Sequence, residues 1–101
     1  MFTEIVTIAY FYQRGEEIAD LVIAVAEHIK AHGQGQPVEI TRNVSGVGNE
    51  LHLVLKYESI SDYEQKRKAR QADAELQRLL LAIAEIIHRS SHHFYEEVWS
   101  K

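Results

Sequence analysis

Residues 50–58 read ELHLVLKYE, a run in which every second side chain is apolar: Leu51, Leu53, Leu55 and Tyr57. A period of two is typical of a β-strand and places these four side chains on one face. The opposite face carries His52, Val54 and Lys56 and is mixed in character. The run therefore predicts a strand with one face against a hydrophobic core, and the fold depends on which segments supply that core.

Three further segments are predicted to be strands. Residues 2–12 read FTEIVTIAYFY and are rich in β-branched and aromatic side chains. Residues 38–45 alternate between apolar and polar side chains, and residues 91–99 form a fourth strand candidate. Residues 46–49, with the sequence GVGN, are typical of a hairpin connection into the strand at 50–58.

A helix is predicted between the first two strands. Glu16 and Glu17 place negative charge where a helix N-terminus favours it, and Gly33 is a typical stop after about His32. Between these limits the apolar residues recur at helical spacing: Ile18, Leu21, Val22, Val25 and Ile29. This helix therefore has one apolar face for the core.

A second helical region follows the strand at 50–58. Ser61 and Glu64 fit a capping box, which starts a short charged helix through about Gln71. Asp73 then opens a longer helix with one apolar stripe: Leu76, Leu79, Leu80, Ile83 and Ile87. The second region is thus expected in two pieces, of which the later one packs on the core.

The resulting element order is βαββαβ. One layer of helices on a four-stranded antiparallel sheet, with strand order 4-1-3-2, is the ferredoxin-like solution for this order. We therefore predict an α+β fold with a single ferredoxin-like domain over residues 1–101, a length that suits one domain.

The face of the sheet without helices is predicted to need a cover. The first strand is apolar on both faces, with Ile5, Ala9 and Phe11 opposite Val6, Ile8, Tyr10 and Tyr12. Each large apolar side chain left in water forfeits about 1.5–3 kcal/mol. We expect a second copy of the chain to cover this face, giving a C2 homodimer whose sheets pack as a dimeric α/β barrel.

Charge argues against a nucleic-acid partner. Fifteen acidic and eleven basic side chains give a formal net charge of −4, which repels phosphate backbones. Four basic residues lie between Lys66 and Arg70, but Asp62 and Glu64 precede Lys66 and Lys68 by four residues. That spacing favours ion pairs on a solvated helix face.

Composition also bears on the compartment. The chain has no cysteine, hence no disulfide and no thiol nucleophile. The longest apolar stretch, residues 79–87, is too short to cross a bilayer, and residues 1–12 lack the basic leader of a signal peptide. We expect a cytoplasmic protein without a membrane partner.

The segment from Ser45 to Glu64, SGVGNELHLVLKYESISDYE, resembles small bacterial members of the dimeric α/β-barrel superfamily. In these NIPSNAP-like and antibiotic-biosynthesis-monooxygenase-like proteins a glycine turn leads into an apolar strand, followed by Tyr-Glu-Ser and a short helix containing Tyr-Glu. The resemblance implies the same fold and a homodimer. The superfamily includes cofactor-free monooxygenases, isomerases, haem-binding enzymes and many proteins of unknown role, so it implies no single reaction.

The resemblance does not extend to haem chemistry. The haem-degrading relatives use an Asn on the first strand with a Trp and a His in the second helical region. This chain has no Asn before Asn43, and its one tryptophan is Trp99. We expect no cofactor.

The candidate site residues are those that the predicted alternation turns into the barrel. On the strand at 50–58 these are His52 and Lys56, and on the preceding strand they include Asn43, with Glu39 and Thr41 beside it. They could bind a small anionic or polyketide-like molecule, with His52 as the candidate general base. Alternatively, they form hydrogen bonds with one another across the dimer or lie solvated at the mouth of the barrel. Tyr10 either adds its hydroxyl to this ligand site or is a core tyrosine.

No metal site is predicted. His28 and His32 stand at i and i+4 on the first helix, with Glu27 beside them, but no further ligand follows at a recognisable interval. His92 and His93 are neighbours on a strand and point to opposite faces, so they cannot chelate one ion together.

Three functions fit these expectations. The first is an uncharacterised homodimer that binds a small organic molecule in its barrel, with His52, Lys56, Asn43 and Tyr10 as contacts. The second is a cofactor-independent monooxygenase or isomerase, and the third is a structural or interaction module whose barrel is filled by its own side chains.

Overall fold

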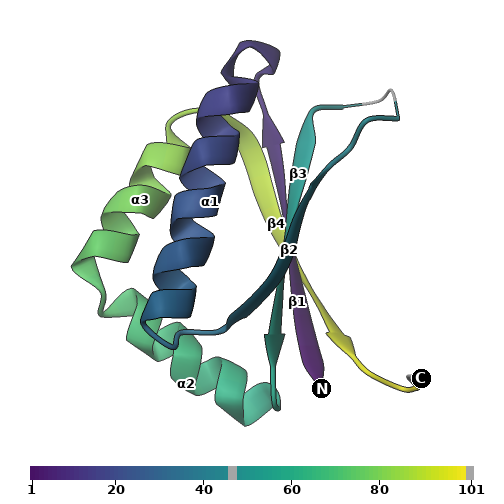
Figure 1. The fold of residues 1–101 in the computed structure, drawn as a ribbon, viewed down its shortest axis with the longest axis vertical. Helices are drawn as coiled ribbons and strands as arrows, with labels where there is room; N and C mark the ends of the chain where they lie inside the picture. The colour runs from purple at the N-terminus through teal and green to yellow at the C-terminus, as the bar shows by residue number, and fades with distance from the viewer. Residues whose placement is uncertain (46–47, 100–101) are drawn as a thin grey trace.

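The computed structural model describes residues 1–45 and 48–99. Its elements are β1 (Phe2–Tyr10), the 3₁₀ turn η1 (Tyr12–Arg14), α1 (Gly15–Ala31), β2 (Gln36–Arg42), β3 (Glu50–Tyr57), α2 (Ile60–Gln71), α3 (Ala74–Ala84) and β4 (Ile87–Glu96). The strands form one antiparallel sheet in the order β2-β3-β1-β4. Figure 1 shows the helices gathered on one side of this sheet. The predicted α+β ferredoxin-like fold and the order 4-1-3-2 are confirmed.

The core lies between the helices and the sheet. The alternating side chains of β3 that the sequence singled out all point to the helices and are at most 4% exposed: Leu51, Leu53, Leu55 and Tyr57. They meet the apolar stripe of α1 and two buried residues of α3, Leu76 and Ile83. From β1, Ile8 and Tyr10 complete the same cluster.

The end of α1 follows the predicted signal. The amide of Gly33 donates to the carbonyl of Lys30, and the amide of Gln34 donates to that of Ile29. This pair of bonds is a Schellman motif, which needs a left-handed residue directly after the helix, and Gly33 supplies it with a φ of 62°. The motif turns the side chain of Gln34 into the interior, where it is 5% exposed.

The predicted start of the second helical region is wrong by two residues. Ser59 caps α2, because its side chain accepts a hydrogen bond from the amide of Asp62. Ser61, expected as the cap, is the second residue of the helix. The sequence offers two serines with a polar residue three positions later, and Ser59 holds the extended backbone that a cap requires.

The boundary between α3 and β4 also differs from the prediction. Asp73 caps α3 as expected, but the helix ends at Ala84, and Ile87 is the first residue of the strand rather than the end of the helical stripe. β4 therefore runs from Ile87 to Glu96 instead of 91–99. The last apolar residues of the stripe fit both periods, so the pattern alone placed the strand too late.

The other boundaries shift slightly. β1 stops at Tyr10 because η1 follows, and β2 starts at Gln36 and ends at Arg42, with an irregularity of register between Pro37 and Glu39. Of the predicted hairpin connection at 46–49, residues 46 and 47 lie outside the described residues.

The sheet has an open face, on which no helix of the described chain packs (Figure 1). The register places alternate side chains of β1, β3 and β4 there, among them Thr3, Ile5, Thr7, His52, Val54, Lys56, Ser91, His93 and Tyr95. Among the described helices, none has the length and apolar character needed to span a membrane.

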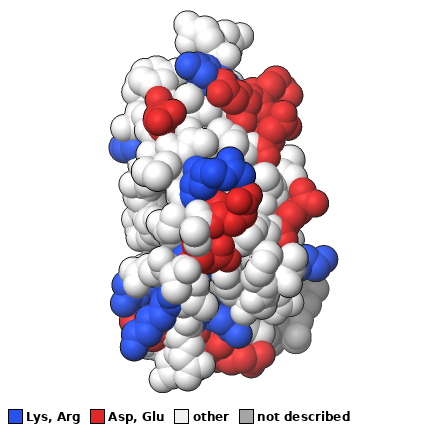
Figure 2. Space-filling view, turned by 90° about the vertical axis from the view of Figure 1, so that its left-hand side faces the viewer, with Lys and Arg blue, Asp and Glu red and all other residues white. Residues whose placement is uncertain are grey.

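The helix-covered side carries intermixed charges. Figure 2 shows basic and acidic groups next to one another there. On α2 the predicted pair of Asp62 and Lys66 is present, with 3.6 Å between carboxylate and ammonium. Glu64, however, pairs with Arg67 at 3.1 Å rather than with Lys68.

Candidate functional site

A buried carboxylate lies at the centre of the candidate site. Glu4 belongs to the helix-facing side of β1 and is only 2% exposed. Its Oε1 accepts a hydrogen bond from the Tyr57 hydroxyl at 2.7 Å, and its Oε2 lies 2.6 Å from Nδ1 of His92. The Arg70 guanidinium is 3.9 Å from Oε1. We refer to Glu4, Tyr57, Arg70 and His92 as the glutamate cluster.

The strand order explains how these residues meet. β1 lies between β3 and β4, and Glu4 stands opposite Leu55 on one side and Phe94 on the other. Tyr57 and His92 are each two positions from those partners, so they share the face of Glu4 and approach it diagonally. Arg70 reaches the cluster from the last turn of α2 and donates to the Tyr57 hydroxyl at 3.0 Å.

Aromatic rings surround the charged end of the cluster. The guanidinium carbon of Arg70 lies 5.8 Å from the ring centre of Tyr57 and 5.9 Å from that of Tyr63. Phe94 stacks on Phe2 and meets Tyr63 edge-on. These contacts hold Arg70 in place through cation–π attraction as well as through its hydrogen bond.

The cluster keeps Glu4 ionised. Burial alone would raise the pKa of its carboxyl, but the hydrogen bonds from His92 and Tyr57 and the positive charge of Arg70 outweigh burial and lower the pKa below 4.5. Burial, together with the charge of Glu4, raises the pKa of the Tyr57 phenol despite the opposing effect of Arg70. Tyr57 is therefore a neutral donor beside a carboxylate.

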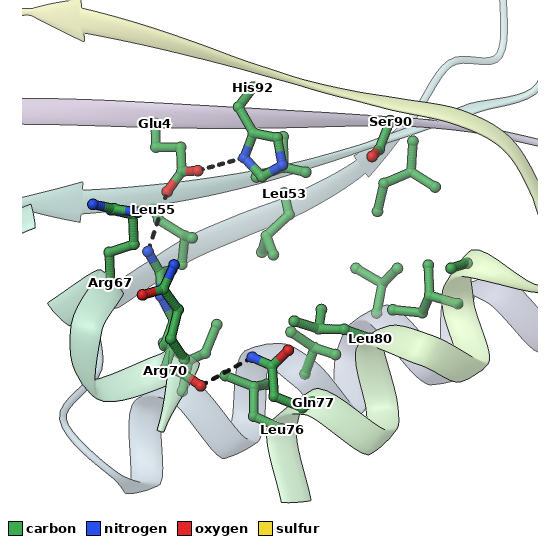
Figure 3. Close-up of a pocket in the computed structure, with 18 of the residues that line it drawn as sticks. Glu4, Leu53, Leu55, Arg67, Arg70, Leu76, Gln77, Leu80, Ser90 and His92 are labelled. Atoms are coloured by element: carbon green, nitrogen blue, oxygen red, sulfur yellow. Dashed lines mark hydrogen bonds and ion pairs between the residues drawn. The ribbon is translucent and has the colours of Figure 1, made fainter. Parts of the chain in front are cut away.

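A cavity of about 380 Å³ opens beside the cluster, between the sheet and the helices. Its walls are largely aliphatic side chains from β1, β3, α1 and α3, including Val6, Leu53, Leu55, Leu76 and Leu80. Polar groups line it as well: Glu4, Arg67, Arg70, Gln71, Gln77, Ser90 and His92. Figure 3 shows Glu4, Arg67 and Arg70 together at one end with Leu55 beside them, and Leu53 and Leu80 further along. A cavity of this size and lining suits a small organic molecule.

His92 is the residue at this site with the capacity for proton transfer. Its Nδ1 is engaged by Glu4, and in Figure 3 its second ring nitrogen is turned away from that carboxylate. When Nδ1 carries the ring proton and donates a hydrogen bond to Glu4, Nε2 has a free lone pair and can act as a base. Glu4 would then fix the orientation of the ring, as a carboxylate does for a catalytic histidine.

The residues that the sequence nominated lie elsewhere. His52 and Lys56 belong to the open face, and Nε2 of His52 lies 3.9 Å from the carboxylate of Glu50. Asn43 follows β2, and its side-chain oxygen accepts hydrogen bonds from the backbone and hydroxyl of Ser45. Tyr10 is 6% exposed in the core, which corresponds to the core alternative for this residue. The structure does not bring these four residues together in one cavity.

Sequence reasoning missed Glu4 and His92 as partners. One signal was available: Glu4 shares its strand face with Val6 and Ile8, so an acidic residue stands on an apolar face. A charge in such a position is nearly always paired. The partner could not be read from the sequence, because His92 is 88 positions away.

Solved proteins of low sequence identity share this fold. An uncharacterised NIPSNAP-domain protein from Burkholderia xenovorans is similar with a TM-score of 0.85 and 16% identity, over 97% of this chain and 95% of that chain. For a NIPSNAP family protein of unknown function from Agrobacterium tumefaciens the values are 0.81 and 21%, over 94% and 86%. For an antibiotic biosynthesis monooxygenase they are 0.69 and 11%, over 97% and 99%.

Neither a protein-family model nor a curated protein matches this chain. At such low identities the structural likeness shows the fold alone. It confirms the resemblance that residues 45–64 carry: the chain has the ferredoxin-like fold of NIPSNAP-domain and antibiotic-biosynthesis-monooxygenase-like proteins.

Proposed function

We propose that this protein binds a small, mostly apolar organic molecule with hydroxyl or carbonyl groups in the cavity between its sheet and helices. The observation that supports the proposal is the cavity itself, about 380 Å³ within a single chain, with aliphatic walls and polar groups among them. Glu4 already neutralises much of the charge of Arg70, and Glu64 pairs with Arg67. The hydrogen-bonding groups that remain for the ligand are Gln71, Ser90, Nε2 of His92 and Oε1 of Gln77, whose Nε2 donates to the Arg70 carbonyl.

The proposal includes a cytoplasmic homodimer formed through the open face. Ile5, Val54 and Tyr95 lie on this face, and Tyr95 is 52% exposed. In such a dimer His52 and Lys56 of both copies would lie between the sheets, where they could contact a ligand as the sequence predicts. The helix-side cavity is favoured as the principal site because one chain suffices to form it.

A tryptophan at the cavity wall tests the ligand site. Leu80 lines the cavity, whereas its neighbour Leu81 is 67% exposed and lies outside it, so Leu80→Trp and Leu81→Trp are matched variants. Native mass spectrometry of the purified proteins reports any retained small molecule. Titration with 1-anilinonaphthalene-8-sulfonate, an anionic aromatic dye that fluoresces in apolar surroundings, measures binding to the cavity.

We expect Leu80→Trp to lose the dye and any retained molecule, and Leu81→Trp to bind as the unmodified protein does. Equal binding by all three proteins would refute the cavity as the site. Unfolding of Leu80→Trp would be detected by circular dichroism, and Ala84→Trp, which also replaces a residue of the cavity wall, then takes its place.

A second candidate function is enzymatic, and the contact between Glu4 and His92 favours it. In a cofactor-independent isomerase or monooxygenase, Nε2 of His92 would remove a proton from the bound molecule, while Glu4 stabilises the imidazolium that forms. His92→Gln should bind the molecule found by mass spectrometry but no longer promote exchange of its acidic protons in deuterated water. Unchanged exchange in His92→Gln would remove this candidate.

A further inference from the structure

Two histidines and an aspartate meet where the end of α1 lies beside the turn between α2 and α3 (Figure 1). One ring nitrogen each of His28 and His32 and a carboxylate oxygen of Asp73 lie within 4.8 Å of one another. Nε2 of His28 is 2.6 Å from Oδ2 of Asp73. The sequence offered the histidine pair without a third ligand, and the fold supplies that ligand from 45 positions further along.

The backbone holds His32 ready to act as a ligand. Its Nδ1 lies 2.9 Å from the carbonyl oxygen of His28, which can only accept, so Nδ1 carries a proton and donates the hydrogen bond. Nε2 of His32 therefore keeps its lone pair. Histidines that bind metals are oriented in this way, by a hydrogen bond from the other ring nitrogen to a backbone carbonyl or a carboxylate. The His28 and His32 rings stack with their centres 4.0 Å apart, which keeps them adjacent.

Gln34 lies beside this cluster and has one unsatisfied side-chain atom. Its side chain is buried by the Schellman turn, and Nε2 donates to Oδ2 of Asp73 at 2.8 Å. Its Oε1 is buried and has no hydrogen-bond partner within residues 1–45 and 48–99. An unsatisfied buried oxygen is costly. If a cation binds, rotation of the amide would exchange the bond from Nε2 for a contact of Oε1 with the ion beside the Asp73 carboxylate.

We propose that His28, His32 and Asp73 bind one divalent transition-metal ion, with Oε1 of Gln34 as a fourth donor. Two imidazoles, one carboxylate and a further oxygen suit the tetrahedral preference of Zn²⁺. The histidines stand at the C-terminal end of α1, which favours positive charge. The ion ties α1 to α3, two walls of the cavity, and its role is structural.

The test measures Zn²⁺ and Co²⁺ binding to the full chain, purified without a polyhistidine tag. Isothermal titration gives the stoichiometry and affinity, and the visible absorption of Co²⁺ reports a four-coordinate site. His32→Ala removes an exposed ligand, and Asp73→Asn removes the carboxylate while keeping a residue that caps α3 well. His88→Ala is the matched control, because His88 lies against Phe11 at the opposite end of α1.

We expect one ion per chain in the unmodified protein and in His88→Ala, with a micromolar or lower dissociation constant. His32→Ala and Asp73→Asn should each weaken binding at least about tenfold. Saturating Zn²⁺ should raise the Tm of the unmodified protein by about 5 °C or more and leave Asp73→Asn unchanged. Binding by Asp73→Asn as tight as that of the unmodified protein would assign the ion to the histidine pair alone and overturn the proposal. Absence of binding at millimolar Zn²⁺ would overturn it as well.

Discussion

Replacing Glu4 by glutamine tests whether the core holds an ionised carboxylate. The change keeps the shape of the side chain and removes its charge. Glu4 takes part in two short hydrogen bonds, with Tyr57 at 2.7 Å and with His92 at 2.6 Å. A hydrogen bond to a charged group contributes about 1.5–3 kcal/mol and a neutral one about 0.5–1.5 kcal/mol. Each bond should therefore lose about 1–1.5 kcal/mol in Glu4→Gln.

The two bonds do not weigh equally. Tyr57 is buried, so its bond to Glu4 bears the whole difference, whereas the side chain of His92 is 53% exposed and its bond is weakened by solvent. We expect the free energy of unfolding of Glu4→Gln at pH 7 to be lower by about 2 kcal/mol. Glu17→Gln, which removes a charge from an exposed pair with Arg14, should change it by less than about 0.5 kcal/mol.

The same variant has a defined pH signature. The folded state lowers the pKa of Glu4 below 4.5, so the unfolded chain binds more protons as the pH falls through this range. The stabilisation by Glu4 is therefore complete well above pH 4.5 and is lost as the pH falls below it. The difference between the unmodified protein and Glu4→Gln should shrink on acidification.

Urea denaturation followed by circular dichroism, at several pH values between 3.5 and 7 and at one protein concentration, measures this difference. A Glu4→Gln protein within about 0.5 kcal/mol of the unmodified protein at pH 7 would show that the cluster contributes no charge-assisted bonds. A difference that stays constant between pH 7 and 3.5 would show that folding does not lower the pKa of Glu4, and a difference that grows on acidification would show that folding raises it.

Three further predictions concern the turn, the cap and the open face. Gly35→Ala should lower the free energy of unfolding by about 1–3 kcal/mol, because Gly35 has a φ of 141° and an added Cβ would lie 3.3 Å from the Tyr57 ring. Gly15→Ala, in the first turn of α1, is the control and should be neutral or stabilising by up to about 1 kcal/mol. Urea denaturation compares the two variants. By the same assay, the free energy of unfolding of Ser59→Ala should be lower by about 1 kcal/mol, and that of Ser61→Ala should be lower by clearly less. The reverse order would show that Ser61 caps the helix, as the capping box in the sequence predicts. Light scattering after size exclusion should give a molar mass of twice 11.6 kDa for the unmodified protein and for Leu81→Lys. Ile5→Lys should give 11.6 kDa, because its charge lies on the open face. A monomeric unmodified protein would refute the homodimer.

The sequence predicts those parts of the fold whose signals are local. The alternation of β3, the stop at Gly33 and the cap at Asp73 each depend on residues within one element, and all three are confirmed. The start of β4 was predicted too late, because Ile83 and Ile87 fit a helical stripe as well as they fit the entry to a strand. Periodicity cannot place such a boundary, since it depends on tertiary packing.

The candidate site was less accessible to the sequence, because its contacts join distant positions. Alternation correctly separates His92 from His93, but it does not say which histidine faces the helices. Glu4 and His92, and likewise His28 and Asp73, become partners only through the strand order and the packing of α1 against α3. Reasoning from one strand at a time therefore nominated His52, whose neighbours on the strand are visible in the sequence, and passed over Glu4.

The glutamate cluster is better explained by a role in orienting side chains at the cavity than by a contribution to the stability of the fold. Val6 and Ile8 show that the same face of β1 accepts aliphatic side chains. Replacing a buried ionic group by an apolar one of similar volume is often neutral or stabilises a protein by about 1–4 kcal/mol. A leucine at position 4 would then satisfy the fold, but it would leave His92 without the partner that engages Nδ1 and Arg70 without a counter-charge beside the cavity. We therefore infer that Glu4 is present because it fixes the orientation of His92 and Arg70 at the polar end of the cavity, where a bound molecule would meet them.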